Sequence, residues 1–363
     1  MTVSVHGSSD PNFPPNLSIL PSSRHQSDPS KRLDDSDSEV DDAEQDIETY
    51  GIAGRTWEAA YLLRQYLTPP KSSSTFSASP VEFDPPCLLY GPSDSSSKPR
   101  RRTILEIGSG TGFLGLSLAP HLLSTDTLIL TDLENVCPLL TKNLSEAQSR
   151  WRRRKKNSFE DEPTCLVRPL PWGNSDFLES SIKQPGLLPD LILASDLVYF
   201  PFLYPPLLRT LLGLTEWKAS DDPRRETEKG PSLIFSHKIR SLVREQPFWE
   251  AFGRWFEFEA VQVGKLVEVE DEEEGVSQGV TTRKEMRRIW SRFGAAHESL
   301  TNKDESDELY IFIAHRRPST LGITEVLSQR SDDDLMLGRN GLEGVVYGGA
   351  QFEEMLLASL EWD

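Results

Sequence analysis

Short apolar runs recur along residues 103–314 and alternate with segments of helical spacing. The runs predict seven strands, at residues 103–107, 128–131, 165–167, 190–194, 232–236, 256–263 and 309–314. Helical patterns occupy residues 113–118, 136–144, 202–214 and 248–252. Strands that alternate with helices predict an α/β fold with a mostly parallel sheet and helices on both faces. No clear helix separates the last two strands, so we expect them to form an antiparallel edge.

Polar and proline-rich stretches mark the limits of this domain. Residues 1–48 are rich in Ser, Pro, Asp and Asn, and we expect a disordered acidic tail there. A helical pattern then begins at Trp57 and stops at a Pro-Pro pair. We expect one domain over residues 50–317 and a partly disordered extension over 318–363. Four segments are expected to be loop insertions, at residues 71–101, 149–162, 218–230 and 268–285.

The charge of the chain bears on its partners. Its 363 residues carry a formal net charge of −18. Nucleic-acid binding needs a basic face, so this charge argues against it and favours a basic protein partner. Basic runs at 100–102 and 152–156 are interpreted as solvated loops, with nuclear-import or RNA-contact patches as the alternative.

Cysteine and histidine spacing excludes further classes of site. The three cysteines and six histidines show no metal-ligand or CxxC spacing, so we expect no metal site and no disulfide. The sequence shows neither a signal-peptide pattern nor an apolar run of membrane-spanning length. We therefore expect a soluble monomer without a membrane partner, in the cytoplasm, with the nucleus as the alternative location.

The strongest chemical signal is a strand that runs into alternating glycines and then a helix. Gly108, Gly110 and Gly112 let the backbone turn and approach a ligand, and the helix N-terminus offers free N–H groups. An overlapping register ending at Gly115 matches the dinucleotide pattern GxGxxG, which alone is weak. Glu106 ends the strand, where its carboxylate would attract a cationic cofactor and repel a pyrophosphate. The motif therefore favours a methyl donor over a dinucleotide.

Three further signals follow later strands. Asp132 ends the second strand, 20 residues beyond Gly112, where a carboxylate can accept hydrogen bonds from ribose hydroxyls or cap the next helix. Trp172, after the third strand, is placed to cover an adenine face or to pack in the core. Asp196 and Tyr199 follow the fourth strand, beside the first, where open α/β sheets bind ligands. They would face a transferred group and its acceptor, or serve as a helix cap and a packing residue.

In this order the signals resemble the seven-stranded protein-lysine methyltransferases called methyltransferase family 16. Residues 54–60 resemble the family's Trp-x-Ala-Ala helix, Asp196-Leu197-Val198-Tyr199 its Asp-x-x-Tyr signature, and Phe248-Trp249 a later aromatic pair. The resemblance covers roughly residues 50–315. It implies a Rossmann-like seven-stranded fold, with Asp196 and Tyr199 in the catalytic pocket. It also implies cofactor contacts at Trp57, Glu106, Gly108, Gly110, Gly112, Asp132, Trp172 and Asp196.

The resemblance implies an S-adenosylmethionine-dependent protein-lysine N-methyltransferase. Because the family includes enzymes that act on translation elongation factors, elongation factor 1-alpha is the first substrate expected. Alternatives are a small-molecule N-methyltransferase of the same fold and a non-catalytic scaffold. A Rossmann oxidoreductase that binds NAD(P) is a third, although no Tyr-x-x-x-Lys signature supports it. The insertions leave substrate identity open.

Overall fold

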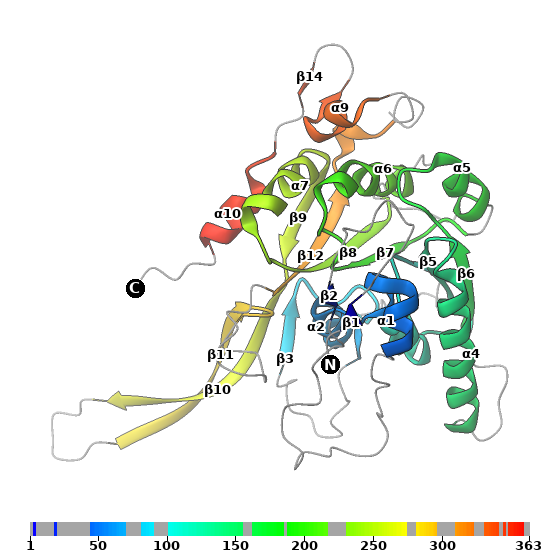
Figure 1. The fold of residues 1–363 in the computed structure, drawn as a ribbon. Helices are drawn as coiled ribbons and strands as arrows, with labels where there is room; N and C mark the ends of the chain where they lie inside the picture. The colour runs from blue at the N-terminus through cyan, green and yellow to red at the C-terminus, as the bar shows by residue number, and fades with distance from the viewer. Residues whose placement is uncertain are drawn as a thin grey trace.

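A seven-stranded sheet forms the centre of the molecule (Figure 1). The computed structural model describes residues 3–4, 18–19, 44–69, 81–90, 101–154, 162–184, 187–216, 230–273, 281–295, 309–322, 330–340, 344–345 and 348–358. The strand order is β6-β5-β4-β7-β8-β12-β9. The bounds are β4 Thr103–Ile107, β5 Thr127–Asp132, β6 Thr164–Pro169, β7 Leu191–Ser195, β8 Ser232–Lys238, β9 Phe256–Ala260 and β12 Leu309–Arg316.

The directions of the strands confirm the predicted fold class. Neighbours from β6 to β8 are parallel, whereas β12 is antiparallel to both β8 and β9. The expected pairing of the last two strands is present, and the antiparallel strand lies one position in from the edge strand β9. The sheet is therefore mostly parallel, with its single antiparallel strand next to one edge.

Helices cover both faces of the sheet. The main helices are α2 Glu58–Leu67, α3 Phe113–Leu118, α4 Cys137–Arg154, α6 Tyr204–Thr215 and α7 Leu242–Trp255. All residues of β4 are buried, because alternate side chains face opposite layers. Leu105 and Ile107 pack in one core with α6 and α7, and Ile104 packs in the other with α2, α3 and α4.

The strand order reverses beside β4. The chain leaves β4 and returns to the sheet as β5 on one side, while β7 lies on the other. The carboxyl ends of these three strands meet at one edge of the sheet, where open α/β folds bind ligands. The segments that follow them are residues 108–112, 132–136 and 196–203.

A second, three-stranded sheet extends away from the body (Figure 1). It pairs β3 Val81–Asp84, β10 Gln262–Glu273 and β11 Thr281–Arg292, all antiparallel. The prediction of a loop at 268–285 is therefore wrong for most of its length, and the insertion at 71–101 contains a strand. The register places Glu270 opposite Lys284 and Asp271 opposite Arg283. The acidic run that suggests a loop is thus part of a strand paired along its length with β11.

The predicted ends of the domain also need correction. α1 Glu44–Tyr50 and the 3-10 turn η2 Gly51–Gly54 begin inside the tail expected at 1–48. In the C-terminal extension, α9 Asp332–Met336 and α10 Gln351–Ala358 pack on α7. Apart from β1 Val3–Ser4 and β2 Ser18–Ile19, the remainder of the expected tail lies outside the described residues, as does much of the insertions at 71–101, 149–162 and 218–230.

Shorter elements complete the described structure: β1 Val3–Ser4, β2 Ser18–Ile19, η3 Ala119–His121, α5 Ser175–Phe177, η5 Leu178–Ile182, η6 Pro201–Leu203, η8 Pro318–Thr320, β13 Arg339–Asn340 and β14 Gly344–Val345. None of the described helices combines the length and hydrophobicity needed to span a bilayer.

The contact between the C-terminal extension and α7 can be tested through Phe352. Its ring is 1% exposed and stacks on Trp249, with 4.9 Å between ring centroids. We expect Phe352→Ala to lower the free energy of unfolding by about 3 kcal/mol or more, because it leaves a cavity in the core. The exposed Glu354→Ala on the same helix should change it by less than about 0.5 kcal/mol. Urea unfolding followed by tryptophan fluorescence measures both, and equal effects would contradict this packing.

Candidate active site

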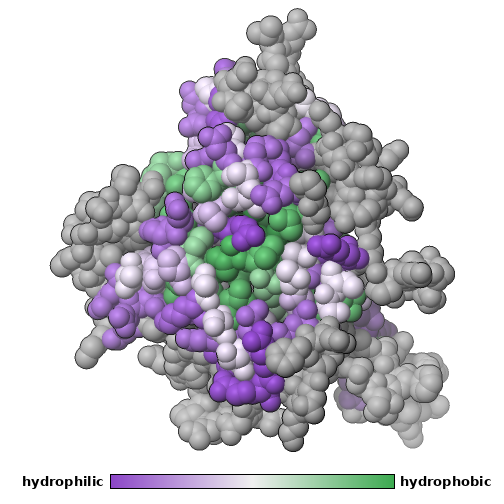
Figure 2. Space-filling view, turned by 90° about the vertical axis from the view of Figure 1, so that its right-hand side faces the viewer, coloured by the Kyte–Doolittle hydropathy of each residue, from purple (hydrophilic) through white to green (hydrophobic). Residues whose placement is uncertain are grey.

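A cavity of about 600 Å³ lies at the carboxyl ends of β4, β5 and β7. Its lining comes from residues 48–60, 106–114, 132–136, 170–172 and 195–206. Cavities of this size hold cofactors and other small molecules. On the face shown in Figure 2, hydrophobic residues gather at the centre within a largely hydrophilic surround.

The glycine loop after β4 leaves one wall of the cavity without side chains. Gly108 and Gly110 have φ of 60° and 53°, in the left-handed region. A Cβ at Gly108 would lie 2.7 Å from a methyl of Leu197 and 3.1 Å from the ring of Trp172. A Cβ at Gly110 would lie 3.0 Å from the Ala53 carbonyl oxygen. Glycine at both positions therefore lets this loop contact the neighbouring segments while its backbone borders the cavity.

Glu106 is buried beneath this loop, with 3% of its surface exposed. Its Oε2 accepts a hydrogen bond from the Gly115 backbone N–H at 2.9 Å. Burial raises the pKa of Glu106 to about 8. A Cβ at Gly115 would lie only 2.5 Å from that carboxylate oxygen. Gly115, the last glycine of the dinucleotide-like pattern, is thus required for packing of α3 against Glu106 and does not by itself discriminate between cofactors.

Asp132 lines the cavity at the end of β5. Its Oδ2 accepts a hydrogen bond from the Gly110 N–H at 2.8 Å, and its Oδ1 accepts one from the Leu133 N–H at 2.7 Å. Burial raises the pKa of this carboxyl. α4 begins only at Cys137, so Asp132 holds the glycine loop in place rather than capping that helix.

Asp196 directly follows β7 with φ of 59°, a left-handed conformation rarely adopted by residues other than glycine. Its carboxylate accepts two hydrogen bonds from the Arg240 guanidinium, at 2.7 and 2.6 Å. A third comes from the Lys238 backbone N–H at 3.3 Å. Burial alone would raise the pKa of Asp196, but the hydrogen bonds from Arg240 outweigh it and hold that pKa well below its usual range. The residue is therefore a paired anion.

The segment before α2 forms a wall that sequence reasoning recognised only at Trp57. The Trp57 indole N–H donates to the Ile52 carbonyl at 3.1 Å, and the Arg55 guanidinium lies 4.3 Å from the ring centroid. Tyr50 and Thr56 also line the cavity. The charged α1 helix buries only Ile47, so its sequence carries little hydrophobic periodicity that could predict this wall.

Aromatic side chains from the segments after β6 and β7 also line the cavity. The ring centroids of Trp172 and Tyr199 are 6.4 Å apart, and Tyr199 packs edge-on against Phe200 at 4.9 Å. Phe200 stacks on Phe202, which is 51% exposed. Trp172 is half-buried; it packs against the core and also lines the cavity. Phe200 and Phe202 were not predicted as site residues, because aromatic residues beside a strand usually indicate core.

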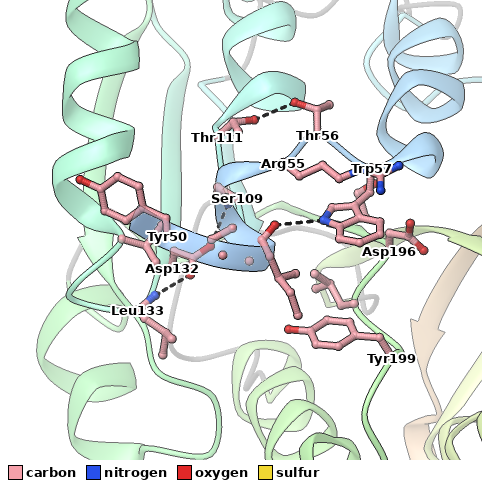
Figure 3. A pocket seen from close by; sticks show the side chains of 18 of the residues that line it. Tyr50, Arg55, Thr56, Trp57, Ser109, Thr111, Asp132, Leu133, Asp196 and Tyr199 are labelled. Carbon is pink, nitrogen blue, oxygen red and sulfur yellow. Dashed lines mark hydrogen bonds between the residues drawn. The ribbon is translucent and has the colours of Figure 1, made fainter. Parts of the chain in front are cut away.

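The structure brings most predicted site residues to one cavity. In Figure 3, Asp132 lies on one side of it, and Trp57, Asp196 and Tyr199 lie on the other. Glu106, Gly108, Gly110 and Trp172 also line it. Gly112 does not; it is the left-handed N-cap of α3. Among the described residues, no cluster of His, Cys, Asp or Glu has an arrangement suited to a metal ion.

Comparison with known proteins gives one family and several relatives. The family model described as lysine methyltransferase matches residues 35–246, which confirms the resemblance found in the sequence. Protein-lysine N-methyltransferase EFM6 of Saccharomyces cerevisiae is 28% identical over 174 residues, covering 46% of this chain and 59% of that protein.

Two further relatives match over similar stretches. Protein N-lysine methyltransferase METTL21A of Danio rerio is 29% identical over 47% of this chain and 59% of its own. Protein-lysine N-methyltransferase EFM3 of Chaetomium thermophilum is 25% identical over 57% of this chain and 49% of that protein. The chain thus spans from about half to three-fifths of the length of these curated relatives.

The raised pKa of Glu106 predicts a pH-dependent stability. The pKa of Glu106 is near 4.5 in the unfolded chain and about 8 in the folded protein, so its stabilising contribution is present below about pH 4.5 and is lost as pH rises through 8. Glu106→Gln does not titrate. Its stability relative to wild type should therefore increase between pH 5 and 8, with a slope of up to ~1.4 kcal/mol per pH unit. Urea unfolding at several pH values, without cofactor, measures this. A difference that stays constant with pH would contradict the burial of a protonated Glu106.

Proposed function

Because this chain belongs to the lysine methyltransferase family, we propose that it is an S-adenosylmethionine-dependent protein-lysine N-methyltransferase. The observation that carries the proposal is one cavity that joins the glycine loop and Asp132 to the Asp196–Tyr199 segment. The glycine loop and Asp132 suit a nucleoside. The Asp196–Tyr199 segment suits the reacting atoms and the acceptor.

The residues that line the cavity fit this cofactor. Gly108 and Gly110 line the cavity without side chains, so a ligand can approach their backbone closely. Asp132 is placed to accept hydrogen bonds from ribose hydroxyls, and Trp172 offers a ring face to the adenine. When bound, S-adenosylmethionine supplies a methyl carbon to the amine nitrogen, as the carbon–sulfur bond breaks and its electron pair remains on sulfur.

The protein must present the acceptor lysine as a neutral amine. A free lysine has a pKa near 10.4, so the site has to favour loss of its proton. Asp196 is unsuited to act as a general base, because its carboxylate is paired with Arg240 and has a low pKa. We assign it the task of holding the reacting groups in line, which alone can supply much of the rate. Tyr199 orients the amine through its hydroxyl or ring face.

The rim of the cavity supports a protein acceptor over a small molecule. Phe202 is 51% exposed and stacks on Phe200, which places an aromatic surface at the mouth of the cavity. A site that encloses a small molecule would bury such rings, whereas exposed aromatic side chains are common in protein interfaces. The net charge of −18 fits a basic partner.

Elongation factor 1-alpha is the first substrate that we propose, on the resemblance given above. A monomeric enzyme located in the cytoplasm is part of the same proposal. A small-molecule amine remains the second candidate, and protein labelling separates the two.

Asp196→Asn tests the role of the carboxylate. Asparagine keeps its shape and tolerates the left-handed backbone. We expect transfer of radiolabelled methyl groups to protein to fall by about 100-fold or more, as when a preorganised polar group is removed from an active site. Near-UV circular dichroism checks that the variant folds. Asp332→Asn, which alters a surface ion pair with Arg209, is the control. Transfer at the wild-type rate by folded Asp196→Asn would exclude this role.

Phe202→Ala tests the aromatic rim. We expect the KM for the protein substrate to rise about 5- to 30-fold, because an exposed interface ring typically contributes 1–2 kcal/mol. The dissociation constant of the cofactor, measured by calorimetry, should stay within about twofold. Leu337→Ala removes an apolar side chain that is 44% exposed beyond α9 and serves as the matched control. An unchanged KM in Phe202→Ala would argue against protein docking at this rim.

A further inference from the structure

Arg240 joins three parts of the active site. It lies in the turn between β8 and α7 and reaches back to the cavity. Its two terminal nitrogens bind both oxygens of Asp196, at 2.7 and 2.6 Å. Nη2 also contacts Glu58 Oε2 at 3.1 Å, in the first turn of α2. The guanidinium carbon lies 5.2 Å from the ring centroid of Trp57. One side chain thus links the loop after β7 to the wall before α2.

Hydrogen bonds to Glu245 hold the turn that carries Arg240. Glu245 Oε1 accepts hydrogen bonds from the backbone N–H groups of Arg240 and Ser241, at 3.1 and 3.0 Å. Glu245 Oε2 lies 3.0 Å from His237 Nε2, and the other ring nitrogen of His237 lies 3.6 Å from Asp196. His237 is fully buried. These contacts fix the backbone from which Arg240 extends, so the guanidinium needs little reordering to meet Asp196.

On the basis of the proposed function, we propose that Arg240 is a positioning residue with two tasks. It neutralises the Asp196 carboxylate beside the acceptor site, and it fastens the start of α2, with Trp57, over the cavity. No part of the assigned chemistry requires Arg240 to touch the substrate.

The first task follows from the charge of Asp196. An unpaired carboxylate within about 4–6 Å of an amine raises the pKa of that amine by about 1–3 units. Such a shift would keep the acceptor lysine protonated and unreactive at neutral pH. A bidentate guanidinium cancels that charge in a fixed geometry. Asp196 can then remain ionised and ordered without opposing loss of the proton.

The second task follows from the contacts of Glu58 and Trp57. Arg55 Nη2 contacts the other oxygen of Glu58 at 2.6 Å, and both arginines lie within 6 Å of the Trp57 ring. Trp57 and Arg55 line the cavity, whereas the Arg240 side chain is 34% exposed and lies at its border. Arg240 and Glu58 form a polar link between the turn after β8 and α2. Breaking it should loosen the wall without altering the glycine loop.

The two tasks can be separated by three substitutions. Arg240→Gln removes the charge and the link, and Arg240→Lys keeps the charge but loses the bidentate geometry. Glu58→Gln leaves the bidentate pair of Arg240 with Asp196 in place and weakens the contacts of Glu58 with both Arg240 and Arg55. Asp196 is faced by Arg240 and His237, and through them by Glu58 and Glu245. His237 and Glu245 stay unchanged in every variant, so a difference between the variants reports on Arg240 and Glu58. Arg209→Gln, which breaks a surface ion pair with Asp332, is the control.

The experiment measures kcat against pH at saturating cofactor, together with the dissociation constant of S-adenosylmethionine. For Arg240→Gln we expect the midpoint of the rising limb of kcat to move up by about one pH unit, equivalent to a tenfold loss at lower pH. Arg240→Lys should restore the wild-type midpoint. Glu58→Gln should leave the midpoint unchanged and weaken cofactor binding by about 3- to 10-fold.

Other outcomes would overturn the proposal in a defined way. A folded Arg240→Gln with the wild-type midpoint excludes the neutralising task, and wild-type cofactor affinity in Glu58→Gln excludes the fastening task. Should Arg240→Gln fail to fold, a shifted midpoint in Arg240→Lys, which keeps the charge, would overturn the neutralising task, and wild-type cofactor affinity in Glu58→Gln would overturn the fastening task. If the wild-type enzyme transfers no methyl group to protein, the proposed function fails, while the cofactor affinities still decide the fastening task.

Discussion

The bidentate pair between Asp196 and Arg240 is the interaction on which the geometry of the site depends. Asp196 is buried in a left-handed conformation directly after β7, and a buried carboxylate is stable only when it is paired and hydrogen-bonded. Arg240 supplies that pairing from the turn after β8, the neighbouring strand. The same guanidinium contacts Glu58. The need to pair the Asp196 carboxylate therefore also determines where the wall formed by the segment before α2 lies.

The parallel sheet makes this arrangement possible. Strands β4, β5, β7 and β8 all end at the same edge of the sheet. The segments that follow them therefore lie close together, although they are separate in the sequence. The glycine loop after β4 meets Asp132 after β5 on one side of the cavity. The loop with Asp196 and Tyr199 follows β7 and meets Arg240, which follows β8. Each loop can therefore change the position of its own site residues while the buried strands stay the same.

Sequence patterns predicted the sheet and most of the cavity because those features are local. A strand that ends in Glu106 and glycine, or in Asp196, is visible in a few consecutive residues, and the alternation of helices and strands predicts a mostly parallel sheet. Charged segments were less predictable. The acidic run of β10 suggested a loop because charged residues predominate in it and give no apolar alternation, and α1 suggested a tail because it buries only Ile47.

The contacts of Arg240 could not be predicted for a related reason. A single arginine in a polar turn carries no periodic signal, and its partners Asp196 and Glu58 are 44 and 182 residues away. Likewise, the sequence suggested that Glu106 meets the cofactor directly, whereas the structure places one of its oxygens on Gly115. Long-range pairing of charged groups is thus the part of the site that needed three-dimensional information.

The most direct test of the proposed function is the chemical identity of the methylated product. Purified protein would be incubated with radiolabelled S-adenosylmethionine and a cell lysate of the source organism, and the labelled proteins would be hydrolysed for amino-acid analysis. The account predicts label in N-methylated lysine, in protein that wild-type enzyme labels and Asp196→Asn does not. Label in another amino acid, or label confined to small molecules, would contradict the assignment as a protein-lysine methyltransferase.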